Sequence, residues 1–176
     1  TGSFLEVEPK ELLLGLNWTN FYLAYQGQDD KSLQVEYAHF VADILRVAAP
    51  DLVQPITQYP AASQRRLRIG FLSSFMRDCT VGSYFKSWVT SLDKGIFEIY
   101  CYHIGHIQDQ VTQEFSHAAD YYKHLVGDVA YIGRQVKKDQ LDILVYPEIG
   151  MDQGVLVLAA MRLAPIQCAA WGHPVT

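Results

Sequence analysis

From Leu67 onward, short continuous runs of apolar residues alternate with stretches in which the apolar residues recur at helical spacing. The runs predict strands at Leu67–Leu72, Phe97–Tyr102, Leu141–Tyr146 and Ile166–Trp171, with a shorter candidate at 121–125. The intervening stretches predict helices at 81–92, 110–118, 128–138 and 155–161. Apolar strands that alternate with helices are typical of a parallel sheet covered on both faces. We therefore predict a doubly wound α/β fold with a mostly parallel, Rossmann-like sheet.

The first sixty residues follow a different pattern and contain no convincing strand. Pro9 opens an apolar turn, and a helix is expected from Lys31 to Ala49, after Asp29 and Asp30. Its apolar positions recur every three or four residues and mark one apolar face of the helix: Leu33, Tyr37, Phe40, Val41, Ile44, Leu45 and Ala48. Prolines 50, 55 and 60 then interrupt any continuous helix. The predicted organisation is a helical segment and linker over 1–60, followed by the Rossmann-like lobe over 61–176.

Charge and composition restrict the partners of the chain. Apolar residues make up 49% and charged residues 19% of the 176 residues, which is ordinary for a folded domain. The net charge of −5 argues against nucleic acid, because phosphate binding needs a concentrated basic face. The dense basic run at 64–68 is interpreted as a linker end, with an anion site as the alternative. No apolar stretch is long enough to cross a membrane.

The cysteines and histidines favour neither a disulfide framework nor a metal site. Three cysteines, at 79, 101 and 168, show no C-x-x-C spacing, which is typical of a reducing cytoplasm and predicts a cytoplasmic protein. The first residues lack the pattern of a signal peptide. His103 and His106 are spaced as two metal ligands can be, but no third ligand is obvious, so a surface loop is the preferred interpretation.

Ligands of such sheets bind at the carboxyl ends of the strands, which directs attention to the loops at 73–80, 103–109, 147–153 and 172–176. The first loop lacks the G-x-G-x-x-G and P-loop signatures. It leads into a helix N-terminus that could bind an anion, although capping of that helix by Asp78 or Thr80 is expected in either case.

Two further residues at this edge carry candidate chemistry. Glu148 follows a strand and could orient a sugar hydroxyl, act as a base, or pair locally. The last strand runs directly into Gly172-His173-Pro174, a sharp turn that delivers a histidine, and histidine can serve as an acid, a base or a phosphate partner near neutral pH. The sequence stops at Thr176, in what we expect to be the middle of this loop.

Several stretches together resemble the catalytic region of the O-GlcNAc transferase family, including its bacterial and SPINDLY-type members. The most specific is Leu163-Ala164-Pro165-Ile166-Gln167, which continues into Trp171-Gly172-His173-Pro174. Weaker matches are residues 67–74, 97–102 and 141–145, and residues 20–27 are similar to the segment that joins the family's tetratricopeptide repeats to its catalytic part. The resemblance covers residues 12–176 and concerns the N-terminal lobe.

This resemblance implies one lobe of a GT-B glycosyltransferase, which moves a sugar, usually N-acetylglucosamine, from its UDP conjugate to protein Ser or Thr hydroxyls. Such an enzyme inverts the configuration at the anomeric carbon of the sugar. It needs no metal and no cofactor, since the UDP-sugar is a co-substrate. Most donor contacts come from a C-terminal lobe, so this chain alone is expected to be inactive, and its exposed cleft face could drive dimerisation. With the loop residues considered above, the candidate catalytic residues are His173 and Asp78. The candidate substrate-binding residues are Cys79, Thr80, Glu148, Gly172, Pro174 and Thr176, of which the resemblance places Pro174 and Thr176, like His173, on the turn that approaches the donor sugar.

The sequence departs from the family at one important position. Family members typically carry a histidine in the loop after the first strand, where this chain has Cys79. A thiol does not replace an imidazole as a base at neutral pH. Either Asp78 or His173 takes over, or activity is altered or absent. The alternative function is then a non-catalytic lobe that binds proteins, with Trp18, Phe21, Tyr22 and Tyr25 as a docking surface. A methyltransferase or flavodoxin-like domain is a third, less favoured alternative.

Overall fold

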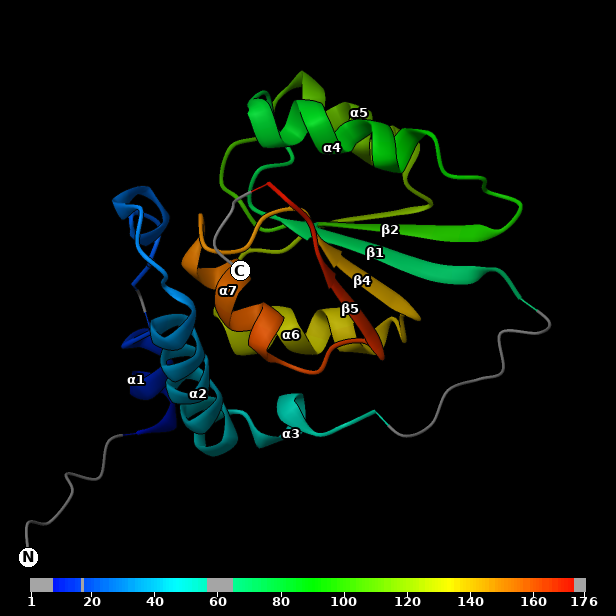
Figure 1. The fold of residues 1–176 in the computed structure, drawn as a ribbon. Coiled ribbons are helices and arrows are strands. Elements are labelled where there is room, and N and C mark those ends of the chain that lie inside the picture. Colours follow the sequence, from blue (N-terminus) through cyan, green and yellow to red (C-terminus); the bar gives the residue numbers. More distant parts are fainter. Residues whose placement is uncertain (1–7, 17, 57–64, 173–176) are drawn as a thin grey trace, which may run out of the picture.

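The computed structural model describes residues 8–16, 18–56 and 65–172. At its centre is a five-stranded sheet with the order β3-β2-β1-β4-β5, and every neighbouring pair of strands is parallel (Figure 1). The strands are β1 (Leu67–Ser73), β2 (Phe97–His103), β3 (Tyr121–His124), β4 (Ile143–Tyr146) and β5 (Ile166–Ala169). The predicted α/β class and the short third strand are both confirmed, and the sheet is parallel throughout.

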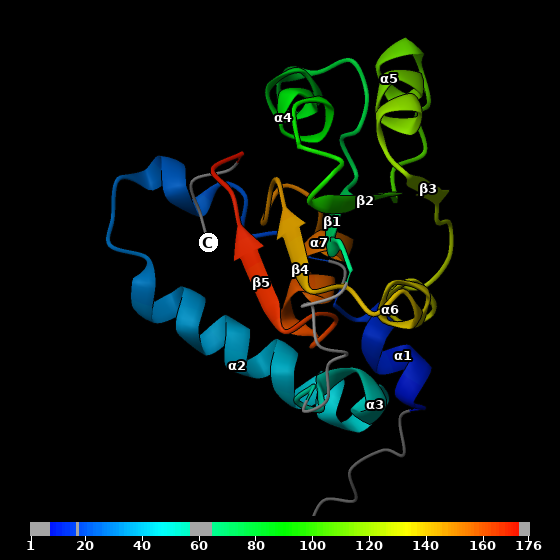
Figure 2. The ribbon, with the colours of Figure 1, turned by 90° about the vertical axis from the view of Figure 1, so that its right-hand side faces the viewer.

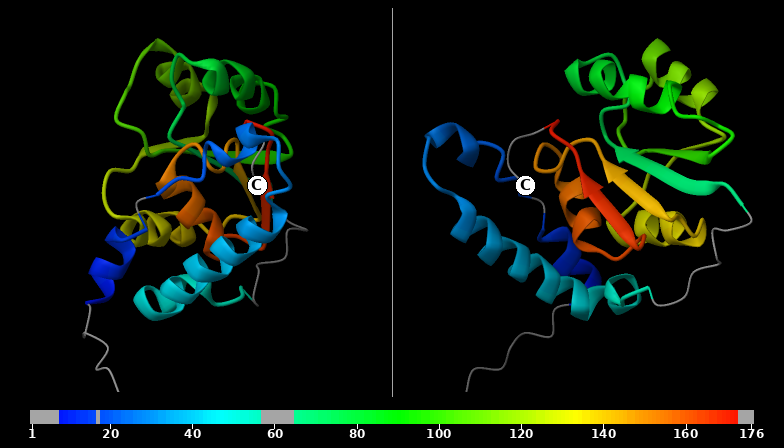
Figure 3. Two further views of the ribbon diagram at one scale, coloured as in Figure 1. Left: turned by 60° about the vertical axis from the view of Figure 1, so that its left-hand side comes forward. Right: turned by 45° about the vertical axis from the view of Figure 1, so that its right-hand side comes forward.

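Helices cover both faces of the sheet, as the continuous apolar strands require (Figure 2). One face carries α4 (Thr80–Thr90) and α5 (Gln110–Ala118). The other carries α6 (Val129–Lys138) and α7 (Gln153–Ala160). The amino-terminal helices α1 (Pro9–Leu14), α2 (Lys31–Ala48) and α3 (Pro50–Val53) lie outside α6 and α7, and a 3₁₀ turn covers Leu23–Gln26 (Figure 3).

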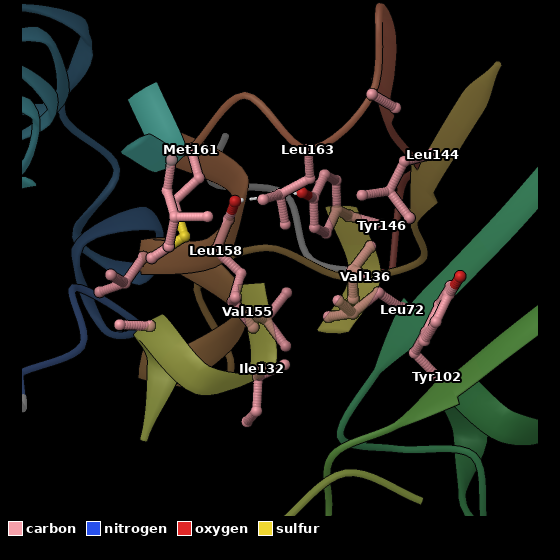
Figure 4. Packing of buried hydrophobic residues seen from close by; sticks show 14 of the residues in the cluster. Leu72, Tyr102, Ile132, Val136, Leu144, Tyr146, Val155, Leu158, Met161 and Leu163 are labelled. Atoms are coloured by element: carbon pink, nitrogen blue, oxygen red, sulfur yellow. Dashed lines mark hydrogen bonds between the residues drawn. The ribbon is translucent and has the colours of Figure 1, made fainter. Parts of the chain in front are cut away.

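The larger core lies on the α6 and α7 side of the sheet. Tyr146 from β4 points into it and donates its buried hydroxyl to the carbonyl oxygen of Leu158 at 3.1 Å (Figure 4). The amino-terminal helices contribute to the same cluster through Leu45 and Leu52, which are fully buried. The predicted helical segment therefore packs into the core of the lobe. The division near residue 60 stays a prediction, and the linker residues 57–64 lie outside the described ranges.

The basic run before β1 is neutralised at the amino edge of the sheet. The guanidinium of Arg65 makes two hydrogen bonds to Asp142, of 2.7 and 2.9 Å, and Arg68 donates from its Nε to Glu98 at 3.0 Å. Arg66 lies 3.5 Å from Asp120. Because these three arginines are paired with carboxylates, the structure argues against an anion site at the basic run. The candidate functional site lies at the opposite edge of the sheet.

Candidate functional site

The order in which strands are added to the sheet reverses at β1, since β2 pairs on one side of β1 and β4 on the other. In open α/β sheets this switch point creates a crevice at the carboxyl ends of the strands. The loop 74–79 after β1, the loop 147–152 after β4 and residues 170–172 after β5 meet there. The structure therefore brings together loops that lie between residues 74 and 172, at the edge where the sequence predicted a site.

Glu148 joins the first two of these loops beneath the surface. It is fully buried, and its carboxylate accepts hydrogen bonds from Ser73 Oγ at 2.8 Å and from the backbone N–H of Ser74 at 3.2 Å. Burial raises the pKa of Glu148 to about 8, and the two hydrogen bonds oppose that rise. Ser73 Oγ in turn accepts the N–H of Phe75 at 2.8 Å. Glu148 therefore pairs with the start of the first loop, while its roles as a base or as a ligand of a sugar hydroxyl stay predictions.

The first loop is held at two further points by α5. Thr112, which is buried, donates its hydroxyl to the carbonyl oxygen of Met76 at 2.7 Å. Asp109 caps α5 with one carboxylate oxygen, which accepts the N–H of Thr112 at 3.0 Å. Its other oxygen accepts the N–H of Asp78 at 2.7 Å. The hydrogen bonds from the backbone N–H groups of Asp78, the larger effect, and of Thr112 hold the pKa of Asp109 below its usual value. Sequence reasoning missed Asp109 and Thr112 as supports of the loop.

The predicted capping of α4 is wrong. The helix begins at Thr80, so the N-cap position falls on Cys79, whose side chain makes no capping hydrogen bond. Asp78 lies one residue too early, with its backbone N–H engaged by Asp109. The thiol of Cys79 lies 3.6 Å from the carbonyl oxygen of Phe75. In contrast, aspartate side chains cap the helices α5, α6 and α7. The start of α4 therefore keeps backbone donors free of a side-chain cap, the arrangement that favours an anionic group.

Gly82 allows the loop to fold back on this helix. A β-carbon at this position would lie 2.0 Å from the carbonyl oxygen of Arg77 and 2.9 Å from that of Phe75. No side chain fits between the helix and the loop backbone, so glycine sets how closely Cys79 and Asp78 approach the helix start.

The end of β5 is fastened to the loop after β4 and to α4. The N–H of Gly172 donates to the carbonyl oxygen of Pro147 at 2.9 Å, and a β-carbon on Gly172 would lie 2.4 Å from that oxygen. The indole of Trp171 packs against Phe85 and Tyr84, with ring centroids 4.9 and 5.2 Å apart. Gly172 is thereby held next to α4, whose N-terminus carries Cys79.

The two histidines of the loop after β2 differ in environment. His103 is buried, hydrogen bonded through Nε2 to the carbonyl oxygen of Ile107 at 2.9 Å, and stacked on His124 at 5.3 Å between ring centroids. Burial lowers the pKa of His103. His106 is exposed. Among the described residues, no group of three His, Cys, Asp or Glu side chains is placed to hold a metal ion.

The predicted site residues thus fall into three groups. Asp78 and Thr80 are exposed on the first loop and at the start of α4, and Cys79 is half-buried between them. Glu148 and Gly172 lie below and beside this loop, held by the contacts described above. His173, Pro174 and Thr176 lie outside the described residues.

A cavity of about 650 Å³ lies elsewhere, between α1 and the starts of α6 and α7. Its lining includes Leu13, Leu16 and Val157 and none of the predicted site residues. Asp128 and Asp152 cap the two helices that start beside it, each accepting one backbone N–H of its helix. Among the described residues, no helix is both long and apolar enough to cross a membrane.

Comparison with solved structures indicates a similarity to O-GlcNAc transferases, as the sequence motifs do. No protein-family model matches the chain, and no curated protein sequence matches it. Among solved structures, a mutant of the O-GlcNAc transferase of Thermobaculum terrenum matches with a TM-score of 0.66 and 25% sequence identity. The match covers 93% of this chain and 30% of that chain. The chain is therefore similar, over nearly its whole length, to part of a glycosyltransferase.

Proposed function

We propose that this chain forms the acceptor-side lobe of a glycosyltransferase, which moves a sugar from a UDP-sugar to Ser or Thr hydroxyls of proteins. The observation that carries the proposal is the structural match to an O-GlcNAc transferase over 93% of the chain. The local geometry supports it, because those site residues that the structure describes, Asp78, Cys79, Thr80, Glu148 and Gly172, lie at one edge of the sheet near the start of α4.

In the proposed reaction the acceptor hydroxyl oxygen forms a bond to the anomeric carbon as the bond from that carbon to the UDP oxygen breaks. The configuration inverts, the proton of the hydroxyl passes to a base of the protein, and the electron pair of the broken bond leaves with UDP. Asp78 and His173 are the candidate bases. Asp78 is exposed beside the start of α4, where free backbone donors favour negative charge. We propose donor-sugar contacts for Gly172, Pro174 and Thr176, and acceptor contacts for Cys79 and Thr80.

For Glu148 we propose a positioning role in place of sugar contact. Its carboxyl group is fully buried and already bonded to Ser73 and Ser74. A group that holds the start of the first loop sets the orientation of Asp78 and Cys79, because these residues follow on the same loop.

The test is a calorimetric titration of UDP and UDP-N-acetylglucosamine into this chain and into the longest natural form of the protein, followed by mass spectrometry of an acceptor protein. We expect micromolar binding and transfer by the long form, no transfer by this chain alone, and at least a tenfold loss of transfer rate in Asp78→Asn. A folded long form that binds neither nucleotide refutes the proposal.

A second candidate is a non-catalytic lobe that binds other proteins. The observation that favours it is Cys79 in the place of the family's histidine, since the thiol is half-buried and engaged with the carbonyl oxygen of Phe75. The same titration separates the two candidates, because a protein-binding lobe has no need to bind UDP.

A further inference from the structure

The helix α2 carries more apolar surface than the lobe buries. Val41 and Leu45 are completely buried against the core. Leu33, Phe40 and Val47, on the adjacent side of the helix, are 53%, 54% and 64% exposed. The lobe therefore buries only the inner half of the apolar face that the sequence predicts. The inner side of α2 contacts α1 and α7, and the outer side lies at the surface of the molecule (Figure 3).

The outer residues follow the spacing of a helix–helix seam. Leu33, Phe40 and Val47 are seven residues apart, and Tyr37 and Ile44 fall between them, so apolar residues recur alternately at four and three positions. This is the a/d pattern with which one helix packs along another. Tyr37 and Ile44 are half-buried against the core, and the ring centroids of Tyr37 and Phe40 are 6.4 Å apart. The stripe is therefore connected to the packed core of the lobe.

Acidic residues border this stripe with the same period. Glu36 and Asp43 are also seven residues apart, four positions before Phe40 and Val47 respectively. On a helix of 3.6 residues per turn they lie on one line beside the stripe. Both are exposed, and Arg46 pairs with Asp43, whereas no ion pair within the described residues involves Glu36.

We propose that the outer stripe of α2 docks an amphipathic helix whose apolar seam is bordered by lysine or arginine. The heptad spacing selects a helix as the occupant, and the acidic border selects the sign of its flanking charge. A second copy of this chain fits less well. An antiparallel copy centred on Phe40 would set Glu36 beside Asp43 of the other copy, and like charges across a seam oppose pairing. This surface is independent of the proposed transfer chemistry.

The probe is a fluorescein-labelled peptide of three heptads with leucine at the a and d positions and lysine at the flanking e and g positions. A second peptide carries glutamate in place of those lysines. Fluorescence anisotropy is measured with both peptides at low salt and at 0.5 M NaCl. We expect the lysine peptide to bind with micromolar Kd, at least tenfold tighter than the glutamate peptide, with the difference shrinking in high salt.

Two substitutions on α2 give a matched pair. Phe40→Asp lies on the stripe, whereas Val35→Asp lies on the opposite side of the same helix at a residue that is 46% exposed. We expect Phe40→Asp to weaken binding of the lysine peptide at least tenfold and Val35→Asp to change it less than twofold. Glu36→Lys should reverse the preference between the two peptides. Circular dichroism and thermal melting of each variant show whether it is folded.

Three results would overturn the proposal: equal binding of the two peptides, equal loss in Phe40→Asp and Val35→Asp, or no binding of either peptide. Light scattering after size exclusion identifies the main rival. A dimer that Phe40→Asp converts to a monomer, combined with no binding of the lysine peptide, would assign the stripe to a second copy of the chain.

Discussion

Replacing Glu148 by glutamine isolates the contribution of a buried carboxyl group at the switch point of the sheet. Glutamine keeps the size of the side chain but does not ionise. Its amide oxygen can accept the N–H of Ser74, while its NH2 group can donate to Ser73 Oγ, as the protonated carboxyl group can. The pKa of Glu148 rises from 4.5 to about 8 on folding. The folded state therefore holds its proton more tightly than the unfolded state, so the wild-type protein loses stability as pH rises from 4.5 towards 8.

The size of this loss follows from the two pKa values. Each unit is equivalent to about 1.4 kcal/mol, and most of the shift is expressed between pH 5 and pH 8, which gives about 3 to 4 kcal/mol. Urea unfolding of wild type and Glu148→Gln, followed by circular dichroism at half-unit pH steps, measures the difference. We expect Glu148→Gln to gain stability relative to wild type by this amount across the range.

The difference between the two proteins is the decisive quantity, because other groups titrate in the same range. Burial lowers the pKa of His103, so folding favours its neutral form and that residue adds stability as pH rises through the ordinary histidine range. Both proteins share this contribution, and it cancels in the comparison. Glu11→Gln, at an exposed site on α1, controls for the change in net charge. Parallel stability curves for wild type and Glu148→Gln, within about 0.5 kcal/mol, would refute the argument.

Three further outcomes follow from the contacts around the site. Thr112→Val, which leaves the carbonyl oxygen of Met76 without its buried donor, should lower the unfolding free energy by about 1 to 3 kcal/mol, and Thr90→Val at an exposed position should not. Gly172→Ala should cost about 1 to 3 kcal/mol in the same urea assay, since its methyl group meets the carbonyl oxygen of Pro147, and an unchanged midpoint would contradict that contact. Burial raises the pKa of Cys101 to about 12, so a thiol reagent should label Cys168 in the folded protein and Cys101 after denaturation alone.

The sequence was sufficient for the five strands, for α2 and for α4 to α7, because a local pattern specifies each of them. Asp128 and the apolar spacing after it predicted the start of α6, and Asp128 does accept the N–H of Tyr131 at 2.8 Å. The failure at α4 is equally local. Asp78, Cys79 and Thr80 all lie near a helix start, and only the path of the loop over Gly82 decides which of them becomes the N-cap.

Contacts between distant segments account for what the sequence did not predict. The spacing of Asp109 and Thr112 is compatible with a capping pair, but nothing near them indicates that the second carboxylate oxygen accepts an N–H from Asp78, 31 residues away. In the same way, the periodicity of α2 identifies apolar positions but does not say which of them the lobe covers. Phe40 and Val41 are neighbours in sequence, yet one is 54% exposed and the other fully buried.

The geometry of the first loop also bears on whether Cys79 prevents catalysis. The loop is fixed by Glu148, Thr112 and Asp109, whereas the thiol of Cys79 makes a long hydrogen bond to the carbonyl oxygen of Phe75. The loop should therefore keep its path when residue 79 changes. If the proposed transfer reaction is slow for want of an imidazole, Cys79→His in the longest natural form should raise the transfer rate by about 100-fold or more, the usual contribution of a general base.

Cys79→Ser, which restores neither a base nor the thiol, is the matched control for that gain. The melting temperature of Cys79→His should stay close to wild type, because the residue is half-buried at the end of a loop that other side chains hold. A faster transfer in the histidine variant alone would mean that the site is otherwise complete and that one side chain sets its rate. A folded Cys79→His variant that binds the UDP-sugar without faster transfer would have one of two meanings. Either a base other than residue 79, such as Asp78, already serves the reaction, or the lobe has lost the transfer activity altogether.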